Sequence, residues 1–282
     1  MKVISLINMK GGVGKTTLAT NICDCLSRRE NKKVLLVDID PQFNATQCLF
    51  SGEDYMTYLK DEGDTILDLF SDTKTTSTST VSGIKHATGK KAEDVEPYKF
   101  KENWYVLPGN LNLHQVEMSP GSGKENRLKK FIKAVQTRYH FDYVIIDTPP
   151  TPSVWMVSAL IASDYYLIPV KPDPLSYTGV SLLENIINSK RDDYDLDIEC
   201  IGVVFTMVEA GGRSVVYRGA SEFMSTSSLA DKCYKDYIPK RTDLAKWQTE
   251  QTFILDLNDN AIKFSLISIV EELIDRIEDE KK

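Results

Sequence analysis

Short apolar runs along this chain alternate with segments in which apolar residues recur every three or four positions. The apolar runs are nearly continuous, which is typical of strands buried on both faces of a sheet. They lie at residues 2–7, 34–37, 143–146, 165–170 and 201–205. Segments with helical spacing lie between them, at residues 16–29, 128–135 and 180–187.

This alternation of strand and helix predicts an α/β protein with a mainly parallel, twisted sheet and helices on both faces. Ligands in such sheets bind beyond the carboxyl ends of the strands. A length of 282 residues suits one large domain spanning residues 1–282. We therefore look for functional residues directly after the expected strands.

Residues 71–98 interrupt the alternating pattern. Residues 71–80 are almost entirely Ser, Thr, Asp and Lys, and a stretch containing Gly and Lys follows. This composition is typical of a mobile surface insertion. The alternative is an element that contacts DNA or a partner protein and becomes ordered on binding.

The glycine-rich stretch after the first expected strand predicts a phosphate-binding loop. Strand, glycine-rich turn and helix follow one another there, which lets backbone N–H groups and a helix N-terminus surround a phosphate. Lys15 would reach the β- and γ-phosphates, and the Thr16 hydroxyl would ligate Mg²⁺. The strict motif has glycine where this chain has Met9, and an additional lysine, Lys10, begins the loop. The residues expected to bind the nucleotide here are Lys10, Gly11, Gly12, Val13, Gly14, Lys15, Thr16 and Thr17.

Aspartates follow two further expected strands. Asp38 and Asp40 end the strand at 34–37, and their side chains need not share a role because they diverge as the strand ends. Asp147 ends the strand at 143–146, where a carboxylate would hold Mg²⁺ through a water molecule, opposite Thr16. The sequence thus predicts a site for a nucleoside triphosphate and Mg²⁺.

Composition and charge narrow the class of protein. Hydrophobic residues make up 41% and charged residues 27% of the chain, as in ordinary globular proteins. No uninterrupted apolar stretch is long enough to cross a bilayer, and the first strand carries no signal-peptide pattern. We therefore expect a cytoplasmic protein.

Together these segments resemble the ParA/MinD family of deviant Walker ATPases, and most closely its short ParA (Soj-like) branch. The resemblance rests on residues 10–17, 38–46 and 147–150, and it runs over most of the chain. It implies a P-loop NTPase fold with a deviant Walker A motif and a homodimer that holds ATP between its subunits. It also implies that Lys10 crosses to the partner's phosphates and that Asp40 positions the attacking water. Lys10, Lys15 and Asp40 would be the catalytic residues of an ATPase with weak intrinsic activity.

The same resemblance places the adenine between two later segments, residues 205–207 and 238–240. Thr206, Met207 and Pro239 would contact the base, with Pro239 against the ring. The Asn-Lys-x-Asp motif of GTPases does not occur in the sequence, which favours ATP. The alternative interpretation of these segments is an ordinary strand end and a turn.

Resemblance to short ParA proteins implies a DNA-segregation ATPase, serving plasmid or chromosome partition. Its ATP-bound dimer would bind double-stranded DNA non-specifically and associate with the nucleoid, and a ParB-type adaptor would stimulate hydrolysis and release. A net charge of −7 argues against a generally basic surface, so DNA binding would need a local basic patch. The general preference for cations at the carboxyl ends of helices explains the presence of Lys190 and Arg191 as well as DNA contact does. The candidate DNA contacts are Lys190, Arg191, Arg213, Arg218, Lys240 and Arg241.

A MinD-like ATPase that acts at a membrane surface is the alternative function. It would need an amphipathic C-terminal helix with a basic polar face. Residues 261–279 are amphipathic, but their polar face is mostly acidic, and anionic lipids would repel it. We therefore expect no membrane partner and a helix that packs on the core. Its apolar face would consist of Ile262, Leu266, Ile269, Val270, Leu273 and Ile277.

Overall fold

The computed structural model describes residues 1–71, 90–116, 123–173, 176–209, 229–242 and 250–279, and between these stretches residues 217–219, 222, 224, 227 and 244. The strands are β1 (Lys2–Leu6), β2 (Val34–Asp38), β3 (Tyr98–Lys101), β4 (Trp104–Leu107), β5 (Tyr143–Asp147), β6 (Tyr165–Val170), β7 (Glu199–Val208) and β8 (Ile238–Pro239). The α-helices are α1 (Lys15–Arg28), α2 (Asn44–Leu49), α3 (Gly52–Lys60), α4 (Ile66–Phe70), α5 (Arg127–Tyr139), α6 (Val154–Ala162), α7 (Ser176–Tyr194) and α10 (Asn260–Asp279). Short 3₁₀ helices are η1 (Ala92–Asp94), η2 (Leu111–Gln115), η3 (Lys124–Asn126), η4 (Ala230–Lys232) and η5 (Ile254–Asp256).

The described strands form one sheet in the order β3-β4-β2-β5-β1-β6-β7-β8. Neighbouring strands are parallel, except that β3 pairs with β4 in the antiparallel direction. The prediction of a mainly parallel α/β sheet is therefore confirmed. The antiparallel edge strand β3 was not predicted, since it falls at the end of the polar stretch.

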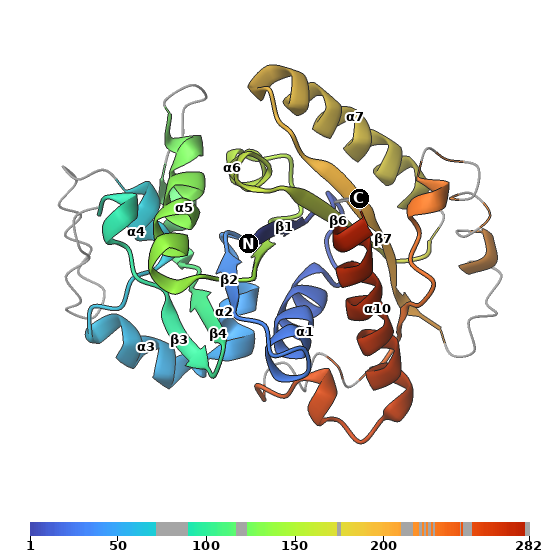
Figure 1. Ribbon diagram of the computed structural model, residues 1–282, viewed down its shortest axis with the longest axis horizontal. Helices are drawn as coiled ribbons and strands as arrows, with labels where there is room; N and C mark the ends of the chain where they lie inside the picture. The colour runs from blue at the N-terminus through green and yellow to red at the C-terminus, as the bar shows by residue number, and fades with distance from the viewer. Residues whose placement is uncertain are drawn as a thin grey trace.

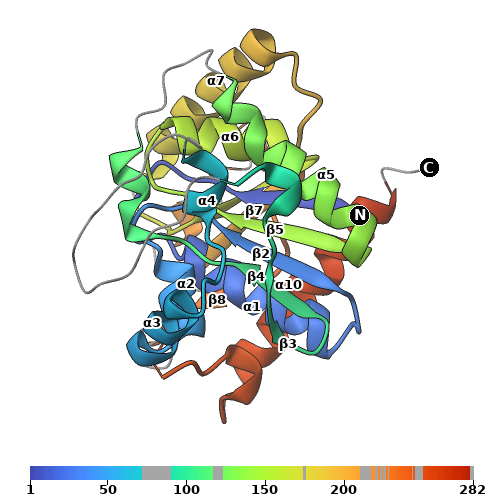
Figure 2. The same ribbon diagram turned by 90° about the vertical axis from the view of Figure 1, so that its left-hand side faces the viewer.

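Helices cover both faces of the sheet (Figures 1 and 2). On one face, α1, α2 and α10 pack on alternate side chains of the central strands, including Ile4, Leu36 and Ile145. On the other face, α4, α5 and α6 cover the half that contains β2 and β5, while α6 and α7 cover β6 and β7. The alternation of strand side chains thus explains why these runs read as continuously apolar.

The strand register brings the predicted acidic residues to one edge of the sheet. β5 lies between β1 and β2, with Leu6 and Asp38 both paired with Asp147. The glycine-rich loop follows β1 directly, at the same carboxyl edge. Residues that are 131 positions apart, such as Thr16 and Asp147, therefore come within hydrogen-bond distance.

The stretch at 71–98 divides into two parts. Residues 72–89 lie outside the described residues. Residues 90–98, by contrast, belong to the fold: Val95 is fully buried in the core beside α5, and Tyr98 begins β3. The composition of this polar segment does not reveal the buried Val95 or the start of β3.

The C-terminal helix packs as its pattern predicts. All six residues of its expected apolar face are buried, and α10 lies against α1, β7 and β8. Because this face is occupied within the protein, α10 has no apolar surface of that size left to insert into a membrane. Among the described residues, no helix is both long and apolar enough to cross a bilayer.

Candidate nucleotide-binding site

Two glycines give the loop after β1 its shape. Gly12 and Gly14 have φ angles of 68° and 78°, a left-handed conformation that side chains with a Cβ disfavour. Gly14 is the N-cap of α1 and offers no side chain to the first helical N–H groups. These unsatisfied donors and the helix dipole make the start of α1 an anion-binding site.

A cavity of about 330 Å³ opens in front of this loop. It is lined by residues 11–17 and by Asp40, Asn44, Gln47, Cys48, Pro150 and Met207. The structure thus brings the predicted loop residues to one cavity, with Lys10 as the exception. Asn44, Gln47 and Cys48 come from α2 and were not predicted as site residues, although Asn44 lies within the segment 38–46 on which the resemblance rests and the other two directly follow it.

Lys15 is a buried cation in this cavity, with only 7% of its surface exposed. Its Nζ donates to the carbonyl oxygens of Asn8 (3.0 Å) and Lys10 (3.4 Å). Burial lowers the pKa of Lys15, because a charged ammonium loses hydration, while Asp147 and Asp40 act in the opposite direction. The ammonium is therefore held in place where phosphate oxygens would complete its coordination.

Asp147 and Thr16 form the part of the site suited to a metal ion. The Thr16 hydroxyl donates to Asp147 Oδ2 at 2.7 Å, whereas the buried Oδ1 has no hydrogen-bond partner within the described part of the chain. Burial raises the pKa of Asp147 to about 7. A buried carboxylate oxygen without a partner, beside a hydroxyl, is the oxygen donor set that Mg²⁺ prefers. These two residues fit a magnesium ion.

Asp38, the last residue of β2, and Asp40, two residues later, have different surroundings. This agrees with the expectation that their side chains diverge as the strand ends. Asp38 is fully buried, and its Oδ2 accepts from the Thr46 N–H and hydroxyl, both at 2.8 Å. The Gly109 N–H donates to the same hydroxyl, and a Cβ at Gly109 would lie 2.9 Å from the Asp38 carboxyl. Asp38 therefore fastens the β2 end to α2, whereas Asp40 lines the cavity.

Lys10 lies outside the phosphate cavity of its own chain. Its side chain is 37% exposed, and its Nζ forms an ion pair with Asp173 in the segment after β6. Lys10 is not among the described residues that line the cavity. Its ammonium is therefore held by a carboxylate at the protein surface and not by the P-loop.

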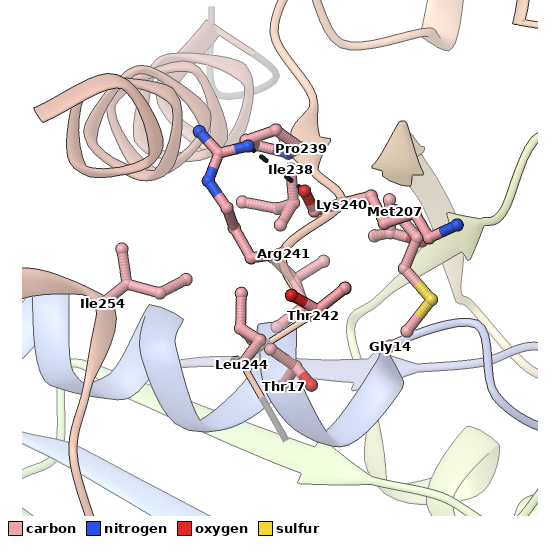
Figure 3. Close-up of a pocket in the computed structure, with 12 residues that line it drawn as sticks. Gly14, Thr17, Met207, Ile238, Pro239, Lys240, Arg241, Thr242, Leu244 and Ile254 are labelled. Atoms are coloured by element: carbon pink, nitrogen blue, oxygen red, sulfur yellow. Dashed lines mark hydrogen bonds between the residues drawn. The ribbon is translucent and has the colours of Figure 1, made fainter. Parts of the chain in front are cut away.

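A second, apolar cavity of about 160 Å³ adjoins the first (Figure 3). Figure 3 shows Thr17 of α1 on one side, Met207 on another and the 238–242 segment above them. The Thr206 hydroxyl donates to the Val13 carbonyl at 2.7 Å, which ties this pocket to the P-loop. The segments expected to hold the base thus meet beside the P-loop. Lining residues that were not predicted include Leu18, Leu244 and Ile254, which sequence motifs do not mark.

The candidate DNA contacts do not form one patch. Lys190 and Arg191 lie near the end of α7, before the start of β7, and Lys190 pairs with Asp193 at 2.6 Å. Lys240 and Arg241 lie beyond the other end of β7, about 30 Å away for a ten-residue strand. A local basic patch could therefore include residues from only one end of β7. Arg218 is exposed, while Arg213 lies outside the described residues.

Arg241 has a different environment from the one expected of a DNA contact. Its Nε pairs with Asp259 at 2.6 Å, and its side chain lines the apolar cavity. Lys240 also lines that cavity and pairs with Glu209 at 3.4 Å. Sequence alone could not reveal these acidic partners, since Asp259 is 18 positions from Arg241.

The fold and the two adjoining cavities define an α/β protein of the P-loop nucleotide-binding class. A family model described as an AAA domain matches residues 1–200. The sporulation initiation inhibitor protein Soj of Bacillus subtilis is 33% identical over 250 residues, 87% of each chain. The chain belongs to the ParA/MinD family of deviant Walker ATPases, on its Soj-like side, and it is an ATPase.

Two further comparisons agree with this assignment. The chromosome partitioning protein ParA of Caulobacter vibrioides is 26% identical over 248 residues, 87% of this chain and 83% of that protein. The ATP complex of a Cyanothece McdA variant shares the fold with a TM-score of 0.77, at 22% identity over 97% of this chain and 96% of that one. The chain therefore has the fold of a ParA-type ATPase over almost its whole length.

Proposed function

We propose that this protein is a DNA-partition ATPase whose ATP-bound homodimer binds double-stranded DNA non-specifically. A ParB-type adaptor would stimulate hydrolysis and so release the DNA. The similarity to a chromosome partitioning ParA supports this function. The observation that carries it is the position of Lys10, an exposed loop lysine outside its own phosphate cavity.

The substrate is ATP with Mg²⁺. Thr16 and the unpartnered Oδ1 of Asp147 would hold the ion, which supplies positive charge at the phosphate oxygens. Lys15 and the N–H groups at the start of α1 would bind the β- and γ-phosphates. The apolar pocket beside Met207 and Pro239 would take the adenine, since a flat ring gains most from dry apolar contact.

Hydrolysis would depend on positioning and on charge, because phosphoryl transfer to water involves little covalent participation by the protein. The Asp40 carboxyl lines the phosphate cavity and accepts from the Gln42 N–H at 2.9 Å, which fixes its orientation. We assign to Asp40 the positioning of the attacking water. Lys15 would stabilise the negative charge on the transferred group.

In this proposal hydrolysis requires a dimer, because Lys10 acts on the nucleotide of the other subunit. A second subunit facing the open side of the cavity would present its own Lys10 to the γ-phosphate, which a lysine held by Asp173 does not reach within one chain. Each site would then be complete only when two chains meet around ATP. Hydrolysis becomes a timed event that ends the dimer and, with it, DNA binding.

The DNA-binding surface would lie on the nucleotide side of β7. Arg218 is exposed. It lies at this end of the sheet because the ring of the neighbouring Tyr217 packs against Tyr237, just before β8, with 5.3 Å between the ring centroids. Lys240 follows β8 and lies at the same end of the sheet. A dimer would double such a patch, and the contacts would be strongly salt-dependent.

The test is binding to a duplex of arbitrary sequence at two salt concentrations, with ATP, ADP or no nucleotide. We expect binding only with ATP, and a steep loss of affinity at the higher salt. Lys10→Ala should still bind ATP but lose both the ATP-dependent dimer, measured by light scattering, and DNA binding. A Lys10→Ala protein that dimerises normally would contradict the role of this lysine.

The basic residues can be compared in the same assay. Arg218→Ala and Lys240→Ala should each weaken DNA binding and reduce the salt slope by about one, whereas Lys190→Ala at the far end of β7 should not. If no state of the protein binds DNA although the ATP dimer forms, the partition function is wrong. Vesicles of anionic lipid would then be the next ligand to test.

A further inference from the structure

One wall of the apolar pocket comes from a segment that is distant in sequence from the P-loop. Ile254 begins η5, is buried, and lies on the opposite side of the pocket from Met207 in Figure 3. Thr17 and Leu18 of α1 line the same pocket. The contacts that hold η5 against α1 therefore determine how this pocket is closed.

Asn21 is the residue of α1 that makes this connection. Its Oδ1 accepts from the Ile254 N–H at 2.7 Å, and its Nδ2 donates to the Thr17 carbonyl at 2.8 Å. Asn21 is only 2% exposed, so water competes little for either hydrogen bond. Asparagine is a poorer helix former than alanine or leucine. Helix formation alone therefore does not account for asparagine at this position, whereas the connection to η5 does.

The two hydrogen bonds of the Asn21 amide differ in how easily they are replaced. The Thr17 carbonyl also accepts from the Thr20 hydroxyl at 3.2 Å, so it keeps a partner when the amide is removed. The buried Ile254 N–H has the Asn21 oxygen as its acceptor. A buried N–H that loses its acceptor is costly, and the backbone shifts to reach a new partner. Loss of the amide should therefore displace Ile254 and leave α1 in place.

Contacts on both sides of Ile254 hold the rest of η5. Phe253 is buried in the core that also contains the apolar face of α1. Asp256 pairs with Arg28, near the end of α1, at 2.8 Å. Neither contact involves Asn21. A change at Asn21 should therefore act locally on Ile254, without loss of the fold or of the phosphate cavity.

We propose that Asn21 is a positioning residue of the ATPase, which fixes the Ile254 backbone so that the Ile254 side chain closes the apolar pocket over the base. Asn21 is not among the described residues that line either cavity, so it acts on the nucleotide through Ile254. The proposal rests on the proposed function, because it takes the adenine to occupy this pocket. Binding of the base should then depend on Asn21, whereas binding of the phosphates should not.

The test compares ADP with inorganic pyrophosphate, which offers two phosphates without the nucleoside. Both ligands are titrated with Mg²⁺ into the full chain by calorimetry. Asn21→Ala should bind ADP about five- to tenfold more weakly and pyrophosphate within about twofold of the unchanged protein, because only Ile254 loses its support. Hydrolysis should show a higher KM for ATP and a kcat within about twofold of that of the unchanged protein.

A second variant keeps the test decisive if alanine at this position disturbs the helix. Asn21→Leu has a similar side-chain size, removes the hydrogen-bond acceptor and favours the helical conformation. It should show the same loss of ADP affinity and the same retention of pyrophosphate affinity as Asn21→Ala. Binding of pyrophosphate also shows that each variant is folded.

Thr20→Ala is the matched control on the same helix. Thr20 is also buried, and its hydroxyl donates to the Thr16 carbonyl at 2.9 Å and to the Thr17 carbonyl, so both bonds stay within this region of α1. Its removal takes away a side-chain hydrogen bond without touching η5. Thr20→Ala should therefore bind ADP and pyrophosphate within about twofold of the unchanged protein.

A double-mutant cycle shows whether Asn21 acts through Ile254. Ile254→Ala should weaken ADP about tenfold, because it removes apolar contact with the base. Addition of Asn21→Ala to this variant should weaken ADP by less than about twofold more, since the side chain that Asn21 positions is already absent.

The proposal is overturned if Asn21→Ala and Asn21→Leu bind ADP as tightly as the unchanged protein, or if they lose pyrophosphate affinity as much as ADP affinity. It is also overturned if Thr20→Ala has the same effect, or if the effects of Asn21→Ala and Ile254→Ala add. DNA binding and dimer formation enter none of these measurements. Failure of the partition function and failure of this inference are therefore distinguishable.

Discussion

The two halves of the nucleotide site are built in opposite ways. The phosphate cavity is polar, and seven of its lining residues are consecutive, at positions 11–17. The neighbouring pocket is mainly apolar, and the residues that line it are scattered along the chain, at positions 14, 17, 18, 206, 207, 238–242, 244 and 254. The phosphate cavity and the apolar pocket adjoin at Gly14, Thr17 and Met207, which line both.

The two halves therefore gain affinity for the nucleotide in different ways. In the phosphate cavity a few buried charges act through electrostatics, so one substitution removes a large part of the effect. In the apolar pocket many contacts each contribute little, and the loss of one is partly compensated by the others. Substitutions should therefore differ in size and in kind between the two halves.

Removal of the buried ammonium should produce the largest effect. Lys15→Ala should lower the hydrolysis rate about a thousandfold, because no other lysine among the described residues lines this cavity. The rate is measured as phosphate release at saturating ATP. ATP affinity distinguishes the two loop lysines, because Lys15→Ala should lower it whereas Lys10→Ala should leave it unchanged. Equal losses of ATP affinity in the two variants would contradict the separation of their roles.

The buried carboxylate of Asp147 makes a prediction about pH. Burial raises the folded-state pKa of Asp147 to about 7, above the ordinary aspartate value of 3.8 that applies to the unfolded chain, so the folded protein binds the additional proton between these values. Stability without nucleotide or metal should therefore fall as pH rises through this window. Asp147→Asn removes the titration, and its stability relative to the unchanged protein should increase by about 2 kcal/mol between about pH 5 and pH 8.

The measurement is urea unfolding in EDTA at both pH values. Glu278→Gln, on the exposed side of α10, is the control and should not alter the pH dependence. The stability difference between Asp147→Asn and the unchanged protein should change between the two pH values. If it is the same at both, the Asp147 carboxyl does not titrate between them.

Sequence predicted the phosphate half far better than the base half. Loop, helix start and strand-end carboxylates are local features, and residues 11–17, Asp40 and Asp147 lie together as their spacing indicates. The apolar pocket needs Ile254, which is 240 positions from Gly14 and reaches it because the Ile254 N–H donates to the Asn21 side chain of α1. No local pattern carries that contact. The ion pair between Arg241 and Asp259 could not be predicted for the same reason, since the two residues are 18 positions apart.

A moderate effect should follow from shortening one side chain of the apolar pocket. Met207→Ala should weaken ATP and ADP by about tenfold each, because it removes apolar contact and no charge. Hydrolysis at saturating ATP should stay close to that of the unchanged protein. The two affinities are measured by titration calorimetry, with Met56→Ala on α3 as a control for an exposed methionine. A change in the ratio of ATP to ADP affinity would show that Met207 also senses the γ-phosphate.

The smallest expected effect concerns the lysine that neither half of the site holds. The Lys10–Asp173 ion pair must break before Lys10 reaches a partner subunit, and both side chains are partly exposed, so breaking it costs little. Asp173→Asn should therefore tighten the ATP-dependent dimer about two- to threefold in sedimentation equilibrium, whereas Asp173→Glu keeps the carboxylate and should not. A weaker dimer in Asp173→Asn would mean that Asp173 itself contributes to the interface. In that case the carboxylate would guide Lys10 across the interface, and the polar half of the site would extend beyond its own chain.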